Sequence, residues 1–223
     1  MGLSDYKEAV GTCASLCTIL QLLVPIFMCR KFMIDGTTGE TSSLPFVVGF
    51  LSSSLWLKYG LMQGEPSLII VNSVGAIMQL CYIAVFYLYC PRKMVVIQQL
   101  LGVALIQALT ILYTIIESDQ EMAIKRVGML CCFMTIAFFA APLTQLAHII
   151  QTGSSESLPF PLTLATFTSS LLWLIYGFII DDPNVKLPNI IGTTLSALQL
   201  SLFVIFPAPR RSPDNRTQVV HVE

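Results

Sequence analysis

The sequence predicts an all-α integral membrane protein whose seven transmembrane helices form two parallel three-helix repeats joined by a linker helix. Of 223 residues, 55% are hydrophobic and only 11% are charged, whereas soluble domains have about 25% charged residues. One core cannot bury so many apolar side chains, so lipid must cover the surplus. The chain contains seven apolar runs, each near the ~20 residues needed to span a bilayer. One motif occurs twice, which predicts the two repeats.

The seven runs are separated by charged or turn-rich segments such as Gln63-Gly64-Glu65-Pro66 and Asp181-Asp182-Pro183-Asn184. We expect the spans at residues 9–29, 43–62, 67–90, 94–116, 125–149, 157–180 and 187–206. Residues 1–91 are predicted to form the first repeat, 92–120 the linker helix, 121–207 the second repeat and 208–223 a disordered cytosolic tail. Three helices reverse the chain direction, so one further crossing is needed before a second trio can run parallel to the first.

The repeat is visible in the residues themselves. SSLWLKYG at 53–60 reappears as SSLLWLIYG at 169–177. Proline, asparagine and glycine residues around this motif recur at one constant spacing: Pro25 with Pro142, Asn72 with Asn189, and Gly75 with Gly192. A membrane unit that occurs twice is the construction of transporters with parallel repeats. The repeated residues therefore indicate where a solute would bind.

Four prolines are predicted to form hinges or a gate near one end of the spans: Pro25, Pro45, Pro142 and Pro159. A proline inside a helix removes one backbone hydrogen bond and clashes with the preceding turn, at a cost of about 3 kcal/mol. Isolated prolines also occur in membrane helices merely as bends. The equivalent positions in both repeats favour the gating interpretation.

The two tryptophans of the chain, Trp56 and Trp173, occupy equivalent positions about halfway through their spans. Tryptophan usually lies at the membrane interface, so indoles at mid-depth favour stacking on a sugar ring over anchoring, with helix packing as the alternative. Asn72 and Asn189 also lie within spans, where a carboxamide needs a partner. They are predicted to bind solute hydroxyls, with interhelical hydrogen bonds as the alternative.

Tyr59 and Asp182 are expected near the outer face, where a hydrogen bond between them would close that end. Lys58 and Asp181 compete as partners for these two residues.

Several functions are disfavoured. The net charge of -1 gives no support for nucleic-acid binding. No metal-ligand spacing, phosphate-binding loop or catalytic triad pattern is visible, so we expect no enzyme activity, cofactor or metal. No Asp, Glu, Lys or Arg lies deep in an expected span, whereas proton-coupled carriers need a titratable group near the site. The pattern favours an uncoupled carrier of a neutral, hydroxyl-rich solute.

The distribution of Lys and Arg favours a cytosolic C-terminus and an outer N-terminus. The sequence does not separate the plasma membrane from the Golgi apparatus as the compartment.

Together, these residues resemble the SWEET sugar transporters, in particular the animal members of that family. The resemblance covers about residues 8–207 and rests on these segments in order: Pro25, Leu44-Pro45-Phe46, Trp56 to Gly60, Val71 to Gly75, Cys90-Pro91-Arg92-Lys93, Ala141-Pro142-Leu143, Leu158 to Pro161, Trp173 to Gly177 and Pro188-Asn189. It implies passive, bidirectional transport of mono- or disaccharides by alternating access, and homo-oligomers in a lipid bilayer.

The resemblance also assigns residues. It implies a proline tetrad at Pro25, Pro45, Pro142 and Pro159. It implies sugar contacts by Asn72, Trp173 and Asn189, and an outer gate of Tyr59 with Asp182. A tryptophan at position 56 should narrow the cavity towards glucose-sized sugars. In each repeat the third helix is expected between the first and the second.

Three alternatives stay open from the sequence. A seven-helix receptor shares the span count but does not predict a repeat. A carrier of amino acids or other solutes is disfavoured by the missing intramembrane acid. A scaffold or trafficking factor has only the tail in its favour.

Overall fold

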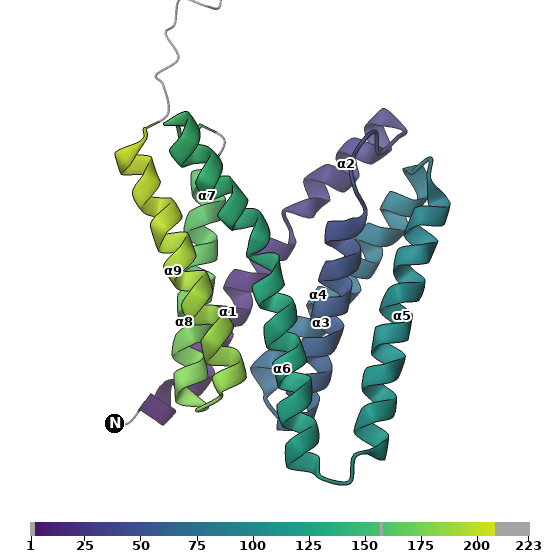
Figure 1. Cartoon of the computed structure of the whole chain (residues 1–223), viewed down its shortest axis with the longest axis vertical. Coiled ribbons are helices and arrows are strands. Elements are labelled where there is room, and N and C mark those ends of the chain that lie inside the picture. Colours follow the sequence, from purple (N-terminus) through teal and green to yellow (C-terminus); the bar gives the residue numbers. More distant parts are fainter. Residues whose placement is uncertain (1–2, 157, 208–223) are drawn as a thin grey trace, which may run out of the picture.

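The computed structural model describes residues 3–156 and 158–207, so the tail predicted at 208–223 lies outside the described residues. All regular structure in the described part is helical, and seven helical spans are long and apolar enough to cross a membrane. The predicted fold class and span count are confirmed. The spans run alternately up and down, so the described chain starts and ends at opposite faces, here named the N-terminal face (lower in Figure 1) and the C-terminal face.

Each repeat consists of one broken span and two continuous ones. A short 3-10 helix, η1, precedes the first repeat. The described helices are η1 (Leu3–Tyr6), α1 (Lys7–Leu22), α2 (Pro25–Asp35), α3 (Leu44–Gln63) and α4 (Pro66–Tyr89), then the linker α5 (Lys93–Ile116), then α6 (Gln120–Phe138), α7 (Ala140–Thr152), α8 (Phe160–Ile179) and α9 (Pro183–Ile205). Helices α1 with α2, and α6 with α7, are the broken spans.

The third span of each repeat lies between the other two, as expected. Helix α4 packs against α1, α2 and α3, and α9 packs against α6, α7 and α8. The repeats meet where α1 packs on α8 and α3 packs on α6. These contacts close six spans into a ring, and α5 lies outside it against α3 at one edge of the bundle (Figure 1).

Two spans begin four or five residues earlier than the sequence predicted, and each is capped by an aspartate side chain. Asp119 Oδ1 accepts hydrogen bonds from the backbone N–H groups of Glu121 and Met122, at 3.0 and 3.1 Å. Asp182 Oδ1 accepts one from Asn184 N at 2.8 Å. Such a cap is worth about 1 kcal/mol. The helices therefore start at Gln120 and Pro183 rather than at 125 and 187.

The earlier start of α9 changes the place of Asn189. This residue lies nearly two turns inside α9, as far from Pro183 as Asn72 lies from Pro66 at the start of α4. The sequence had placed Asn189 less than one turn inside its span. The two asparagines are thus equivalent in depth as well as in sequence.

Only two of the four prolines lie at helix breaks. The first span breaks immediately before Pro25, and the fifth breaks at Phe139, three residues before Pro142. Pro45 lies in the first turn of α3, and Pro159 is the residue before α8. At these places a helix lacks the hydrogen bond that proline would remove. Two of the four prolines therefore lie at or near helix breaks, and the other two lie at helix starts.

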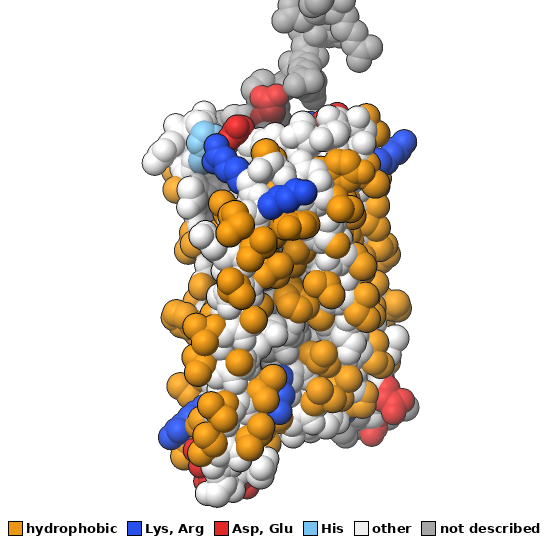
Figure 2. Space-filling model, turned by 90° about the vertical axis from the view of Figure 1, so that its right-hand side faces the viewer, with side chains coloured by type: hydrophobic (Ala, Val, Ile, Leu, Met, Phe, Trp, Pro, Cys, Tyr) orange, Lys and Arg blue, Asp and Glu red, His pale blue; other side chains and the backbone are white. Residues whose placement is uncertain are grey.

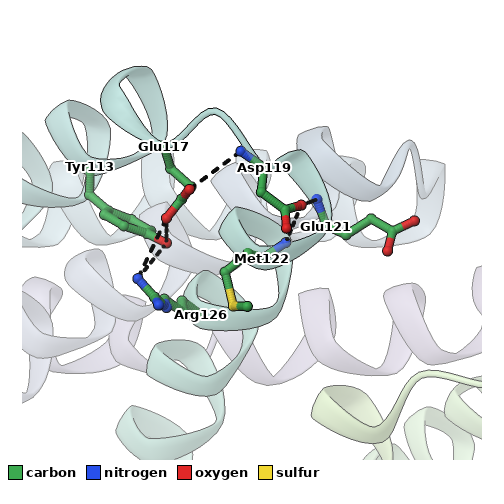
Figure 3. Close-up of polar contacts among 6 residues, drawn as sticks. All are labelled: Tyr113, Glu117, Asp119, Glu121, Met122 and Arg126. Atoms are coloured by element: carbon green, nitrogen blue, oxygen red, sulfur yellow. Dashed lines mark hydrogen bonds and ion pairs between the residues drawn. The ribbon is translucent and has the colours of Figure 1, made fainter.

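The distribution of apolar and charged side chains on the surface is that expected of a protein in a bilayer. Figure 2 shows hydrophobic side chains over the middle of one face, with Lys, Arg, Asp and Glu gathered towards the two ends. At the N-terminal face a polar cluster ties α5 to α6 (Figure 3). Tyr113 donates to Glu117 Oε2 at 3.0 Å, and Arg126 Nη1 donates to the Tyr113 hydroxyl at 3.1 Å. Arg126 also lies 3.5 Å from Glu117 Oε2.

Candidate functional site: a paired cavity between the repeats

A cavity of about 260 Å³ lies between the two repeats. Its twelve lining residues form six pairs, each at the spacing that separates Pro25 from Pro142. The pairs are Thr18 with Thr135, Ser52 with Ser169, Trp56 with Trp173, Leu68 with Val185, Val71 with Pro188, and Asn72 with Asn189. The cavity therefore lies on the pseudo-twofold relation between the repeats. No lining residue is ionisable.

Each indole is held by a threonine of the opposite repeat. Trp173 Nε1, on α8, donates to Thr18 Oγ1 on α1 at 2.9 Å. Trp56 Nε1, on α3, donates to Thr135 Oγ1 on α6 at 3.1 Å. A buried indole N–H normally needs such an acceptor. The bonds fix the rings and leave their apolar faces for packing or for a ligand.

The two asparagines also make matching contacts. Asn72 Nδ2 donates to the Leu68 carbonyl, and Asn189 Nδ2 to the Val185 carbonyl, both at 2.8 Å. These bonds stay within one helix, four residues back, and they orient the amides without joining two helices. A carboxamide has a second N–H and an acceptor oxygen besides. Each asparagine can therefore both donate to and accept from a polar solute.

On the N-terminal side of the cavity, hydrogen bonds between the repeats close the face. The Tyr59 hydroxyl donates to Asp182 Oδ2 at 2.6 Å, and it accepts from Asn184 Nδ2 at 3.1 Å. Tyr59 is fully buried and Asp182 is 5% exposed. The neighbouring Asp181 is paired with Lys186 instead, and this bond lowers the pKa of Asp181.

An equivalent contact, which the sequence analysis missed, closes the same face a second time. The Tyr176 hydroxyl donates to Glu65 Oε2 at 2.7 Å. Tyr176 and Glu65 stand at the repeat spacing from Tyr59 and Asp182. Lys7 Nζ lies 2.9 Å from Glu65, which ties the start of α1 to this contact. The signal that could have found it was the repeat spacing, applied to the acidic residue before each third span.

Two equivalent glycines allow these tyrosines to pack so closely. A methyl group at Gly11 would overlap the side chains of Ser67 and Tyr176, and one at Gly128 would overlap those of Asn184 and Tyr59. Each tyrosine also packs edge-on against the cavity tryptophan one turn earlier. The ring centroids are 5.7 Å apart for Trp56 with Tyr59 and 5.4 Å for Trp173 with Tyr176. The closing contacts are therefore physically continuous with the cavity wall.

The repeats separate towards the C-terminal face. There α2 packs mainly on α4, and α7 mainly on α6 and α9, each within its own repeat. Figure 1 shows α2 and α7 diverging. Pro45 and Pro159 are exposed, and Pro25 and Pro142 are partly exposed. The repeats are thus tied together by hydrogen bonds at the N-terminal face and diverge towards the C-terminal face.

The structure brings together most of the predicted site residues. Trp56, Asn72, Trp173 and Asn189 share one cavity, and Tyr59 contacts Asp182. The four prolines predicted as hinges lie outside the cavity lining: Pro25, Pro45, Pro142 and Pro159. The sequence analysis missed Thr18, Thr135, Ser52 and Ser169 in the lining. Among the described residues there is no cluster of His, Cys, Asp and Glu suited to a metal ion.

The family model described as "Sugar efflux transporter for intercellular exchange" matches the chain twice, at residues 8–94 and 125–211. The two matches cover most of the chain and coincide with its two three-helix repeats. The chain belongs to the SWEET family. The resemblance drawn from the residues is thereby confirmed.

Relatives across animals and plants support the assignment. The Sugar transporter SWEET1 of Drosophila pseudoobscura pseudoobscura is 42% identical over 202 residues, which cover 90% of this chain and 89% of the relative. The mouse Sugar transporter SWEET1 is 39% identical over 80% of this chain and 81% of its own. The rice Bidirectional sugar transporter SWEET13 is 32% identical over 90% of this chain and 69% of its own.

The fold is also that of a solved SWEET protein. A structure of a eukaryotic SWEET transporter superposes with a TM-score of 0.86 at 28% identity, covering 92% of this chain and 98% of that one. This chain therefore shares its helix order and repeat arrangement with that structure.

Proposed function

We propose that this SWEET protein is a facilitative, bidirectional uniporter that moves glucose-like sugars across a membrane by alternating access. The observation that carries the proposal is the cavity between the repeats, with an indole and a carboxamide contributed by each. A flat indole can cover the C–H face of a sugar ring, while amides and hydroxyls bind its rim of hydroxyl groups. The names of the relatives support sugar as the cargo.

The size of the cavity favours a monosaccharide over a disaccharide. Its volume of about 260 Å³ is below the range of about 300–1,000 Å³ common for small-molecule sites. Trp56 and Trp173 both take up space in it, and their bonds to Thr135 and Thr18 hold them there. We propose Trp56, Asn72, Trp173 and Asn189 as the sugar-binding residues.

The contacts at the two faces support alternating access. Two tyrosine–carboxylate hydrogen bonds close the N-terminal face while the repeats part at the C-terminal face. For the opposite conformation these bonds must break and the C-terminal ends must approach. We propose that the helix breaks at Pro25 and Pro142 act as hinges, and that Pro45 and Pro159 approach one another when that face closes.

The proposed orientation in the membrane rests on the distribution of Lys and Arg. We propose that the N-terminal face is extracellular or lumenal and that the C-terminus is cytosolic, in the plasma membrane, the Golgi or both. In this orientation the described conformation faces inward. We propose homo-oligomers from family resemblance.

Purified protein in liposomes is expected to equilibrate labelled glucose in both directions. The rate should not change when a pH gradient across the liposome is collapsed, because no ionisable residue lines the cavity and nothing there can carry the proton of a coupled step. Uptake of tracer is the measurement, and protein-free liposomes are the control. Folded protein that passes no sugar in either direction would contradict the proposal, and dependence on the pH gradient would contradict the uniport mechanism.

A further inference from the structure

The helix break before Pro25 leaves backbone carbonyls in need of partners. Proline has no N–H, so the Gln21 carbonyl cannot receive its helical bond from residue 25. Val24 N bonds to it instead, at 3.1 Å. One residue later, Ile26 N bonds to the Leu23 carbonyl at 3.0 Å. In an unbroken helix, Ile26 N would donate to the Leu22 carbonyl. Because it bonds to Leu23 instead, the Leu22 carbonyl loses its backbone donor.

The side chain of Tyr82 supplies the missing donor. Its hydroxyl donates to the Leu22 carbonyl at 2.7 Å. Tyr82 lies on α4, the central helix of the first repeat, and is 5% exposed. The ring packs against Phe46 of α3, with centroids 6.1 Å apart. A buried phenol on the central helix is thus aimed at the backbone of the neighbouring span, at the point where this span bends.

The second repeat carries a related contact. Gln199 stands at the repeat spacing from Tyr82, on α9, and is 6% exposed. Its Nε2 donates to the carbonyl of Pro142 at 3.5 Å, a length at which a hydrogen bond is weak. In both repeats a buried donor from the central helix therefore reaches a carbonyl beside the broken span.

We propose that Tyr82 is a positioning residue for transport, which stabilises the bent form of the first span by bonding the Leu22 carbonyl. When this span straightens, Ile26 N can return to Leu22, and the tyrosine is no longer needed as a donor. In the bent form the carbonyl lies away from water, where an unmade hydrogen bond is costly. Tyr82 therefore favours the conformation closed at the N-terminal face. This inference rests on the proposed alternating access.

Accessibility of the cavity from the N-terminal face tests the proposal. A cysteine introduced by Ser52→Cys lies in the cavity lining, and its labelling by a membrane-impermeant thiol reagent from that face reports the conformation open there. Tyr82→Phe keeps the ring and removes only the hydroxyl. We expect it to increase this labelling roughly fivefold, the ratio that one ordinary hydrogen bond is worth. The same variants without Ser52→Cys correct for native cysteines.

The matched control is Tyr87→Phe, the same chemical change on the same helix. The Tyr87 hydroxyl makes no hydrogen bond within the described residues, and its ring, which lies under Lys93, is retained. We expect its labelling to equal that of the parent. Labelling of Tyr82→Phe that also equals the parent would overturn the proposal, and so would an equal increase in both variants.

A second comparison separates positioning from general support of the fold. In a Pro25→Ala background the helix can bond normally, so the increase caused by Tyr82→Phe should shrink. An undiminished increase would contradict the proposal. If Tyr82→Phe does not fold, Tyr82→Gln and Tyr82→Leu replace it: glutamine, the residue at the equivalent position 199, can still donate and leucine cannot. Equal labelling of these two would overturn the proposal. The expected labelling differences, found together with an absence of glucose flux in the parent, would count against the proposed function alone.

Discussion

Replacement of Asn189 by alanine is expected to reduce glucose transport by roughly ten- to a hundredfold, because a buried polar group left without its partner costs about 1–3 kcal/mol. The variant removes the amide that the Val185 bond orients towards the cavity. Trp173→Ala should lose transport to a similar extent, since it removes a ring face and opens the cavity. Tracer uptake into liposomes with equal amounts of folded protein is the measurement.

Two further variants make the test specific. Gln98→Ala removes a carboxamide from an exposed position on α5, outside the cavity, and should transport normally. Trp173→Phe retains an aromatic face but loses the bond to Thr18, so its loss should be smaller than that of Trp173→Ala. Normal uptake by both Asn189→Ala and Trp173→Ala would show that the sugar binds elsewhere.

The combined change Tyr59→Phe and Tyr176→Phe should favour the conformation open at the N-terminal face by roughly a hundredfold. Each hydroxyl donates to a carboxylate, and a hydrogen bond to a charged group is worth about 1.5–3 kcal/mol. The rings remain, so their edge-on contacts with Trp56 and Trp173 are preserved. Labelling of a Ser52→Cys reporter from that face, and the rate of sugar exchange, are the measurements.

The single variants decide whether the two contacts act together. Each alone should increase labelling by about tenfold, since each removes one of the two tyrosine–carboxylate hydrogen bonds. Tyr87→Phe, whose ring stays under Lys93, is the control for the same chemical change. Unchanged labelling in the double variant would mean that these bonds do not hold the face closed.

The sequence predicted the large features of the fold because each has a strong local signal. Apolar runs between charged breaks gave the seven spans, and the recurrence of the tryptophan motif gave the two repeats. The helix starts at Gln120 and Pro183 were placed too late, because Lys125, Arg126 and Lys186 resembled loop residues. The capping bonds of Asp119 and Asp182 hold these polar turns in helical form.

The candidate site was predicted in part for a different reason. Tryptophan and asparagine stand out in a membrane span because each is unusual there, whereas Thr18 and Thr135 are common residues that reveal their role only through the indoles they bond. Glu65 lay in a short turn, and only its repeat spacing from Asp182 marked it. Its contact with Tyr176 depends on how α8 packs on α1 across the repeat interface, which local sequence does not specify.

Intrinsic fluorescence tests the central claim most directly, because the only two tryptophans of the chain, Trp56 and Trp173, both line the cavity. Titration of the purified protein with glucose should give a saturable change in tryptophan emission, and Asn189→Ala should abolish it over the same concentrations. A protein that transports glucose while its tryptophan emission stays constant throughout the titration would contradict the assignment of the sugar to this cavity.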